Sequence, residues 1–365
     1  MSMNVHTVGD AFIDLSLGDC PAEAHPLINE GIAKDLEKGF SNYSPFRGDP
    51  ELTDAILEAF QTDHGLAIDR DQVLVTASSS HAMWMLLTVL LRHGGDVLVP
   101  VPCYPPYRQQ VALCGGTLRE IDLGDGYAPL TWADIEILIS ERTRVLILNS
   151  PCNPTGSFID EQVMREILEE CRRRDVFVIF DDCYQVACYE KAYRPVLRTS
   201  DEFVGCAILT SFSKDYGLAG WRVGHMIADP KILDRCVQVN EANIFTAPSM
   251  SQRAALHALT HRCEIRADVS AHLRDARARA VASFGAIPGW SCRPPAGAIY
   301  LWCDVSSTGM SGPQAARRAC EVGVGLQPGS IFGGSRAYDY VRLSFSGGAG
   351  RLTEAAERIR AACWD

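Results

Sequence analysis

The sequence contains no apolar run long enough to span a membrane. Its longest mostly apolar stretch, residues 82–91, falls well short of the roughly 20 residues that cross a bilayer. The first fifteen residues, MSMNVHTVGDAFIDL, have neither a basic start nor an apolar core, so we expect no secretory signal. These absences exclude a membrane-spanning protein and favour a cytoplasmic one.

Positive charge is also scarce. The 365-residue chain has 34 Lys and Arg against 45 Asp and Glu, which gives a net charge of −11. This balance opposes broad contact with nucleic acid or anionic lipid, so we expect no nucleic-acid partner and no membrane partner. A phosphate group would have to be held by a few local side chains.

The cysteines lack the spacing of a disulfide scaffold. Fourteen are scattered with no Cys-x-x-Cys pair, and we interpret them as reduced and mostly buried. His257 and His261 stand four residues apart in a helical pattern with Cys263 nearby, a spacing that suits metal ligands. No third ligand stands at a suitable position, so an ordinary polar helix face is favoured and we expect no metal.

The length favours two domains, or one large domain with a smaller lobe. From about residue 70 to 230, β-branched runs alternate with amphipathic helical patterns, which predicts an α/β fold with a mostly parallel, seven-stranded sheet. The predicted strands are 73–76, 96–100, 117–121, 145–149, 176–181, 207–211 and 224–227. Ligands of such sheets bind beyond the carboxyl ends of the strands.

The pattern changes after Pro248. A helical stretch at 251–284 leads into short strands near 298–303 and 340–345 and a final helix at 352–362, which predicts a smaller α+β domain. Residues 1–35 precede the sheet pattern and are grouped with it. We therefore expect a large domain at 36–250 and a small one made of 1–35 plus 251–365.

Three segments combine a strand end with chemically useful residues. They are LNSPCNPTG at 148–156, VIFDDCY at 178–184, and SFSKDYGLAGWRVG at 211–224. Each has an ordinary interpretation, because Asn153 suits a structural turn, Asp181 a helix N-cap, and Lys214 a surface position in a Gly-rich turn. These interpretations do not explain why all three segments occur in this order.

In this order the segments resemble the class I/II aminotransferases, pyridoxal-phosphate enzymes with the aspartate-aminotransferase-like fold (fold type I). The resemblance runs from IDLSLGD at residue 13 to YVRLSF at residue 340. Its most specific part is the pattern S-x-S-K-x-x-G-L-x-G-x-R-x-G, accompanied by N-P-T-G and D-x-x-Y. It implies a reaction that moves an amino group from an α-amino acid to a 2-oxo acid, with pyridoxal 5'-phosphate as cofactor.

The resemblance also assigns roles around the cofactor ring. Lys214 would form the covalent link to the cofactor aldehyde and later move a proton. Asp181 would pair with the pyridine nitrogen and keep it protonated. Tyr184 and Asn153 would hydrogen-bond the phenolic oxygen, and Tyr104 would stack on the ring.

Other residues would hold the cofactor phosphate. Ser211, Arg222 and the start of a helix at Ser79 and Ser80 match the family's phosphate site, since a helix N-terminus presents free N–H groups to an anion. Ser78 stands where Gly is frequent and is interpreted first as an N-cap.

Three further matches concern the substrate and a partner subunit. Arg342 resembles the family's bidentate clamp on the substrate α-carboxylate, and Asn153 and Gly18 would lie beside that carboxylate. Tyr43 matches a tyrosine that reaches the phosphate of a neighbouring subunit, which implies a homodimer with shared active sites.

Several residues at or near these segments have no matching role. Cys152 stands where His is common before N-P-T-G, and its effect stays open. His81 and His225 are interpreted as structural, and Asp182 and Asp215 as supporting or surface groups.

Other functions remain open at this point. The same scaffold hosts elimination, cyclisation and oxidation of amino acids, although the Lys214 segment looks more like that of transaminases. A ligand-sensing domain of a transcription regulator would carry an N-terminal DNA-binding module, which the sequence does not suggest. The substrate side chain cannot be read from the sequence; residues 19–25, DCPAEAH, would favour a cationic one.

Overall fold

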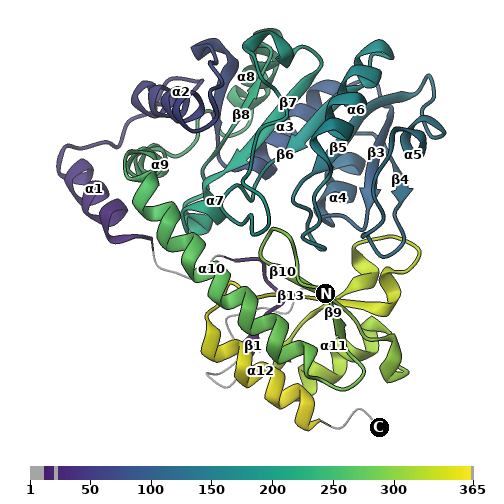
Figure 1. Cartoon of the computed structure of the whole chain (residues 1–365). Coiled ribbons are helices and arrows are strands. Elements are labelled where there is room, and N and C mark those ends of the chain that lie inside the picture. The colour runs from purple at the N-terminus through teal and green to yellow at the C-terminus, as the bar shows by residue number, and fades with distance from the viewer. Residues whose placement is uncertain (1–11, 20–23, 363–365) are drawn as a thin grey trace.

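The computed structural model describes residues 12–19 and 24–362. Its centre is a seven-stranded sheet with the order β2-β8-β7-β6-β5-β3-β4 (Figure 1). All of its strands run parallel except β8, which is antiparallel to both of its neighbours. The strands are β2 Val73–Thr76, β3 Asp96–Val101, β4 Thr117–Asp122, β5 Thr143–Asn149, β6 Phe177–Asp181, β7 Cys206–Ser211 and β8 Gly224–Ala228.

Each of the seven predicted strands is present, with ends within two residues of the prediction. The α/β prediction with a mostly parallel seven-stranded sheet is therefore confirmed. Six of the strands could be recognised because most of their residues are buried on both faces of the sheet, so they form nearly continuous apolar runs. The edge strand β4 is mostly exposed and has no such run.

Helices cover both faces of the sheet, and alternate strand residues point to each face. On one face Val97, Ile147 and Ile179 pack with α3, α4 and α8. On the other, Leu98 and Leu146 pack with α2, α5, α6 and α9. These helices are α2 Pro50–His64, α3 Ser79–Leu90, α4 Pro106–Leu113, α5 Trp132–Glu136, α6 Glu161–Arg173, α8 Pro230–Glu241 and α9 Ser249–Thr260.

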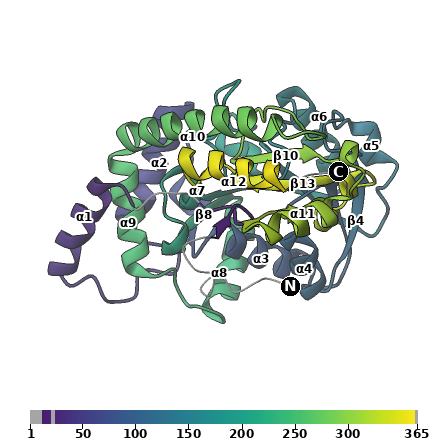
Figure 2. The same cartoon turned by 90° about the horizontal axis from the view of Figure 1, so that it is seen from below.

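A second core lies in the smaller lobe. Its four-stranded sheet has the order β12-β13-β10-β9, and a short pair, β1 with β11, lies beside it. In Figure 2, α10 and α12 lie side by side across the outer face of this lobe. The elements are β1 Ile13–Asp14, β9 Ser291–Cys292, β10 Tyr300–Asp304, β11 Val324–Gly325, β12 Gln327–Pro328, β13 Tyr340–Ser344, α10 Arg262–Gly285, α11 Gly312–Glu321 and α12 Ala349–Ala361.

The single helix expected at 251–284 is wrong in one respect, because the chain forms two helices there. The backbone leaves helical geometry at His261 (φ −108°, ψ 23°), between α9 and α10. Residues 249–284 contain no glycine or proline and are rich in Ala, Arg and Leu, which favour helix, so no local signal in the sequence marks the break. Alpha-helix α9 and Ile28 and Ile32 of α1 (Pro26–Glu37) pack with the large sheet, although the sequence grouped 1–35 and 251–365 with the smaller lobe. The domain boundaries themselves stay a prediction.

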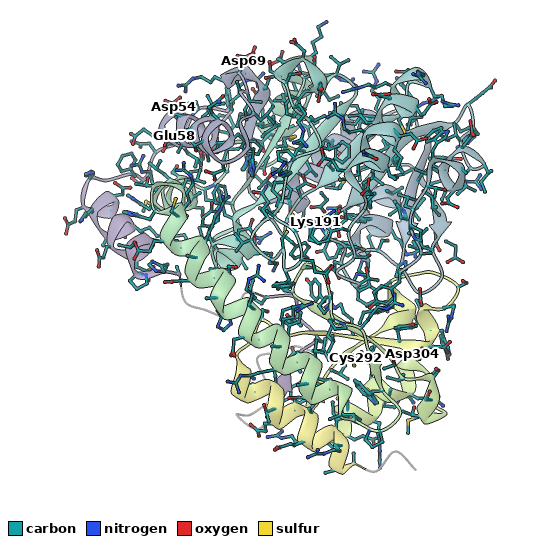
Figure 3. All side chains as sticks on the ribbon, in the orientation of Figure 1. Asp54, Glu58, Asp69, Lys191, Cys292 and Asp304 are labelled. Atoms are coloured by element: carbon teal, nitrogen blue, oxygen red, sulfur yellow. The ribbon has the colours of Figure 1, made fainter. Side chains whose placement is uncertain are left out.

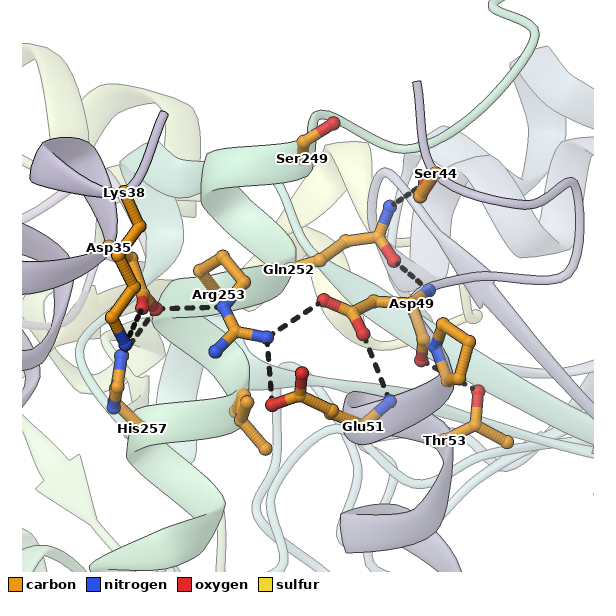
Figure 4. A network of polar contacts seen from close by, with 12 residues as sticks. Asp35, Lys38, Ser44, Asp49, Glu51, Thr53, Ser249, Gln252, Arg253 and His257 are labelled. Carbon is orange, nitrogen blue, oxygen red and sulfur yellow. Dashed lines mark hydrogen bonds and ion pairs between the residues drawn. The ribbon is translucent and has the colours of Figure 1, made fainter. Parts of the chain in front are cut away.

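A polar network fastens α1 and α2 to α9 (Figure 4). The buried Arg253 donates to Asp35 of α1 over 2.7 Å and to Asp49, the N-cap of α2, over 3.2 Å. His257 Nε2 lies 2.7 Å from the same Asp35 oxygen. Gln252 accepts from the Asp49 backbone N–H over 2.7 Å. The partner of His257 is therefore a carboxylate across the helix interface.

Candidate active site

A cavity of about 540 Å³ lies at the carboxyl ends of the central strands and is also lined from the smaller lobe. It brings together residues that are far apart in the sequence, from Ser16 to Arg342. Eleven of the twelve residues predicted to form the site line it: Gly18, Ser79, Ser80, Tyr104, Asn153, Asp181, Tyr184, Ser211, Lys214, Arg222 and Arg342.

Lys214 enters the cavity from a short helical turn directly after β7. Ser211 ends that strand and caps α7 (Phe212–Asp215), with its hydroxyl accepting from the Ser213 N–H over 3.1 Å. The Lys214 ammonium donates to the carbonyl oxygen of Gly18. The amine is thus aimed at the chain segment that precedes α1, across the cavity.

Asp181 is the last residue of β6, and both of its oxygens accept hydrogen bonds. Tyr107 donates to Oδ2 over 2.5 Å, and the Cys183 thiol donates to Oδ1 over 2.8 Å. Burial raises the pKa of Asp181, and these two hydrogen bonds oppose that rise. A positive charge beside this carboxylate would be strongly favoured, because the carboxylate lies in a poorly solvated place.

The sequence analysis did not assign Tyr107 or Cys183 a role. Cys183 stands in the segment 178–184 and Tyr107 follows Tyr104 by three residues, but a residue type alone does not show where its side chain points. Tyr107 stands in the first turn of α4, lines the same cavity and directs its hydroxyl at Asp181.

The other end of the cavity is built to receive an anion. Ser79 and Ser80 begin α3, whose N-cap Ser78 accepts from the His81 N–H over 3.0 Å, so the N-cap interpretation of Ser78 is confirmed. A helix start presents free N–H groups and a positive dipole end. Arg222 stands nearby in left-handed geometry, with φ 55°.

Gly224 keeps this end of the cavity closely packed. A Cβ at Gly224 would lie 2.9 Å from the Ser79 nitrogen and 2.7 Å from the Thr210 carbonyl oxygen. Both distances are shorter than real Cβ atoms tolerate, so only glycine lets β8 approach the start of α3 this closely.

Arg342 projects from β13 and connects two segments that line the cavity. It donates to Asn153 Oδ1 over 3.0 Å and to the Ser16 carbonyl oxygen over 2.5 Å. Its Nε is buried and has no hydrogen-bond partner. The guanidinium carbon lies 4.3 Å from the Tyr300 ring centroid and 5.0 Å from that of Phe332. This buried donor is therefore available to an acceptor that enters the cavity.

Tyr184 and Tyr300 face each other across the cavity, with their hydroxyl oxygens 3.1 Å apart. Burial raises the pKa of Tyr184 well above its usual value, so its hydroxyl stays protonated and can donate. A Cβ at Gly18 would lie 2.0 Å from the Tyr300 hydroxyl. Tyr300 was not found from the sequence, because it begins an ordinary buried strand.

Tyr43 is the predicted residue that does not line this cavity. Its side chain is 78% exposed and lies against Phe245, with ring centroids 4.9 Å apart. Phe46 contacts the same ring and is also exposed. The structure thus places Tyr43 in an aromatic patch on the surface.

The remaining residues of the sequence analysis lie outside the cavity. Burial lowers the pKa of His81 to about 4 and that of His225 to about 3, so both rings are neutral at pH 7. The Cys152 thiol lies 3.6 Å from the Pro102 carbonyl oxygen and lines a separate cavity. Asp215 is buried and accepts from the Val186 N–H over 3.0 Å, so a surface position is wrong for it.

Asp182 points away from Asp181 into another cavity. It is buried, its Oδ2 accepts from Tyr193 over 2.6 Å, and burial raises its pKa to about 7. Lys191, labelled in Figure 3, lines the same cavity and lies over the Phe158 ring. The two adjacent aspartates therefore serve different surroundings, and only Asp181 belongs to the candidate site.

The described residues form neither a metal site nor a membrane span. Within 12–19 and 24–362, no group of three or more His, Cys, Asp or Glu could hold a metal ion. In the same part of the chain, no helix is long and apolar enough to cross a membrane. Residues 1–11 and 20–23, which carry the signal-peptide expectation and most of the segment linked to a cationic substrate, lie outside the described residues.

Comparison with known proteins gives one consistent result. The family model described as "Aminotransferase class I and II" matches residues 10–359. A (5-formylfuran-3-yl)methyl phosphate transaminase of Methanocaldococcus jannaschii is 28% identical, over 99% of this chain and 94% of its own length. An aspartate aminotransferase from Thermus thermophilus, solved with maleate, superposes with a TM-score of 0.90 at 26% identity, covering 97% of this chain and 92% of its own. An aromatic aminotransferase from Pyrococcus horikoshii gives 0.89 at 27% identity, covering 98% and 96%.

Proposed function

The chain belongs to the class I and II aminotransferases, and from this membership we propose that Lys214, Asp181 and Arg342 carry its reaction in the 540 Å³ cavity. It is an aminotransferase that uses pyridoxal 5'-phosphate and acts on an α-amino acid and a 2-oxo acid. Among the described residues, no contact favours elimination, cyclisation or oxidation over this reaction.

The cavity fits the cofactor on three points. The start of α3, with Ser79 and Ser80 and with Arg222 nearby, suits a phosphate. Asp181, buried at the end of β6, suits a protonated pyridine nitrogen. Lys214 presents a primary amine to the same cavity, which is what an aldehyde requires.

One observation carries the assignment of roles. Lys214 donates to the Gly18 carbonyl oxygen, and Arg342 donates to the Ser16 carbonyl oxygen, two residues earlier. The amine and the guanidinium therefore meet at one short segment, although they are 128 residues apart in the sequence. A substrate whose α-carboxylate displaces the Ser16 carbonyl from Arg342 would place its Cα beside Lys214.

The chemistry of each side chain follows from this arrangement. When bound, pyridoxal 5'-phosphate supplies an aldehyde for an amine and a ring that delocalises the electrons left at Cα. Arg342 binds the α-carboxylate through its planar fork and so orients Cα. Lys214 removes the proton from Cα. Asp181 holds the proton on the pyridine nitrogen.

Tyr184 and Asn153 act on either side of this centre. Tyr184 keeps its proton, because its pKa is raised, and donates to an oxygen of the cofactor. Asn153 Oδ1 accepts from Arg342, so it steadies the clamp that faces the substrate. Tyr104 lines the same cavity, and its flat ring would stack on a bound cofactor and exclude water there.

The test is a covalent one. Borohydride reduction of the purified chain with cofactor, followed by peptide mass spectrometry, should place the cofactor on Lys214. Lys214→Ala should lose both the label and turnover, whereas Lys191→Ala, which alters another cavity, should keep both. Label on a lysine other than Lys214 would contradict the assignment.

We also propose that the protein is a cytoplasmic homodimer. The exposed aromatic patch of Tyr43, Phe46 and Phe245 supports this, because apolar rings of this size on a surface are typical of an interface. Tyr43 would then reach the phosphate end of the partner's cavity. The twelve cysteines among the described residues are all free thiols, which suits a reducing compartment.

A further inference from the structure

We propose that this site selects amino acids with a flat, apolar and uncharged side chain, rather than dicarboxylic or cationic ones. The proposal rests on the proposed function, because it assumes that Arg342 binds the α-carboxylate. It concerns the part of the cavity that receives the side chain, and the names of the relatives point both to aspartate and to aromatic substrates. The charges of the lining residues and the exposure of its apolar residues carry it.

Few positively charged side chains line the cavity. Every Lys and Arg of the chain lies in the described residues, since 1–11, 20–23 and 363–365 contain none. Of these, Lys214, Arg222 and Arg342 line the cavity. Each already has a use, as amine, phosphate ligand and α-carboxylate clamp, so no cation is left for a second carboxylate.

Residues 38–47, around the Tyr43 that would approach from a partner subunit, contain two cations, and both have partners in their own chain. Near Tyr43, Lys38 lies 3.5 Å from Asp35. Arg47 donates to the Asp71 carbonyl oxygen over 2.8 Å and to Asp234 over 2.5 Å. A substrate with two carboxylates would have to leave one of them in poorly solvated surroundings without an opposite charge, which is costly.

Negatively charged side chains are also scarce in the described lining of the cavity. Asp181 is the one carboxylate among the described residues that line the cavity, and its two oxygens already accept from Tyr107 and Cys183. It lies at the cofactor end, opposite Arg342. A cationic side chain therefore has no counterion beside the clamp, and the cationic substrate suggested by residues 19–25 is not favoured by the lining that the structure describes.

Apolar side chains line the cavity beside Arg342. The rings of Tyr300 and Phe332 flank its guanidinium, at 4.3 and 5.0 Å. Leu17 is next to Ser16, whose carbonyl occupies the clamp, and Ile331 is next to Phe332. Both line the cavity, yet Leu17 is 50% and Ile331 40% exposed.

These exposed side chains define what the substrate would gain. A side chain that leaves Cα beside Arg342 would cover Leu17 and Ile331 and lie against the two rings. Burial of apolar area and ring contacts both stabilise an aromatic side chain there. A carboxylate or ammonium in the same place would lose water and gain no partner of opposite charge from the described lining residues.

Binding of unreactive analogues tests the proposal without turnover. Calorimetry on the cofactor-loaded enzyme would compare 3-phenylpropionate with succinate, because both carry the first carboxylate and differ in the second group. We expect 3-phenylpropionate to bind at least about 10-fold more tightly. Equal or tighter binding of succinate would overturn the proposal.

A pair of variants at one exposed position makes the test specific. Ile331→Lys adds a cation at the mouth and should shift the ratio of succinate to 3-phenylpropionate affinity by about 10-fold or more toward succinate. Ile331→Gln has similar length without charge and should weaken 3-phenylpropionate with little gain for succinate. An Ile331→Lys enzyme with an unchanged ratio would place the side-chain site elsewhere and contradict the proposal.

Turnover separates this proposal from the function on which it rests. Half-reactions with L-phenylalanine and L-aspartate would be followed by the cofactor absorbance. Faster reaction with L-phenylalanine supports both, and faster reaction with L-aspartate overturns the substrate class but keeps the transaminase. Selective binding of 3-phenylpropionate with no reaction of any amino acid would support the substrate class and contradict the proposed roles in transamination.

Discussion

Asp181 and Asp182 are adjacent in the sequence, but their side chains line different cavities. Asp181→Asn should keep the cofactor but lose roughly 100-fold or more in kcat, since a neutral amide cannot hold the pyridine proton during charge development. Asp182→Asn is the matched control and should stay within about threefold, because Asp182 contacts Tyr193 in another cavity. Cofactor content and single-turnover rates measure both. Equal losses in the two variants would contradict the assignment.

The raised pKa of Asp182 also predicts how the stability of the chain changes with pH. Asp182 keeps its proton in the folded chain up to about pH 7, against a usual pKa of 3.8. Between these values the folded state binds the extra proton, so this group's contribution makes the chain less stable as pH rises. Asp182→Asn should flatten the fall of the urea midpoint between pH 4 and 7. A steeper fall in the variant would show that Asp182 is ionised in the fold.

Arg342 allows a test in which the substrate is changed along with the protein. Wild-type enzyme should strongly prefer an amino acid to its decarboxylated amine, because the guanidinium fork binds the carboxylate in a bidentate manner. Arg342→Lys should lose most of this preference, about 10-fold or more, since a point charge cannot reproduce the fork. Cofactor content should stay unchanged. Half-reaction kinetics with L-phenylalanine and 2-phenylethylamine measure it, and a variant that keeps the preference would move the carboxylate elsewhere.

At the scale of helices and strands, the Arg253 network holds α1 and α2 on α9. Arg253→Met should destabilise the chain by about 3–5 kcal/mol, because it leaves the buried Asp35 without its main partner. Arg70→Met, which removes the exposed pair with Asp54, should cost about 1 kcal/mol or less. Urea unfolding of the two variants measures the difference. Equal effects would show that the buried network adds nothing beyond a surface pair.

Asp35 also makes the stability of the packing between α1 and α9 depend on pH in the acid range. Burial alone would raise its pKa, but the hydrogen bonds from Arg253 and His257 outweigh burial and lower it. The stabilisation is therefore present above about pH 4 and is lost as pH falls through the lowered value. The urea midpoint of Asp35→Asn, measured at several pH values below 4, should fall less steeply with falling pH than that of the wild type.

The elements also show what the sequence could predict. The strand ends at Asn149, Asp181 and Ser211 were visible because buried β-branched runs stop at polar residues. The break at His261 was not, since helix-favouring residues continue on both sides of it with no glycine or proline between them. Tyr300 and Phe332 were missed for a related reason: long-range packing turns these apolar residues toward Arg342, and no local pattern records that.

At the scale of the whole molecule, the aromatic patch makes a prediction about assembly. Phe245→Asp should shift the protein to a monomer and lower its activity, because it places a charge between Tyr43 and Phe46. Leu113→Asp changes an equally apolar but isolated exposed residue on α4 and should leave assembly intact. Light scattering coupled to gel filtration measures both, and a wild-type monomer would contradict the proposed dimer.

The clamp formed by Arg342, Asn153 and Ser16 has a consequence for the order of synthesis. Synthesis reaches Asp181, Lys214 and the proposed phosphate end by residue 222. Arg342, which we propose binds the carboxylate, follows 120 residues later on β13, which pairs with β10. A growing chain would therefore acquire its cofactor groups first and its means of holding a substrate almost last. Nascent chains could mature around the cofactor before any amino acid can be held for reaction.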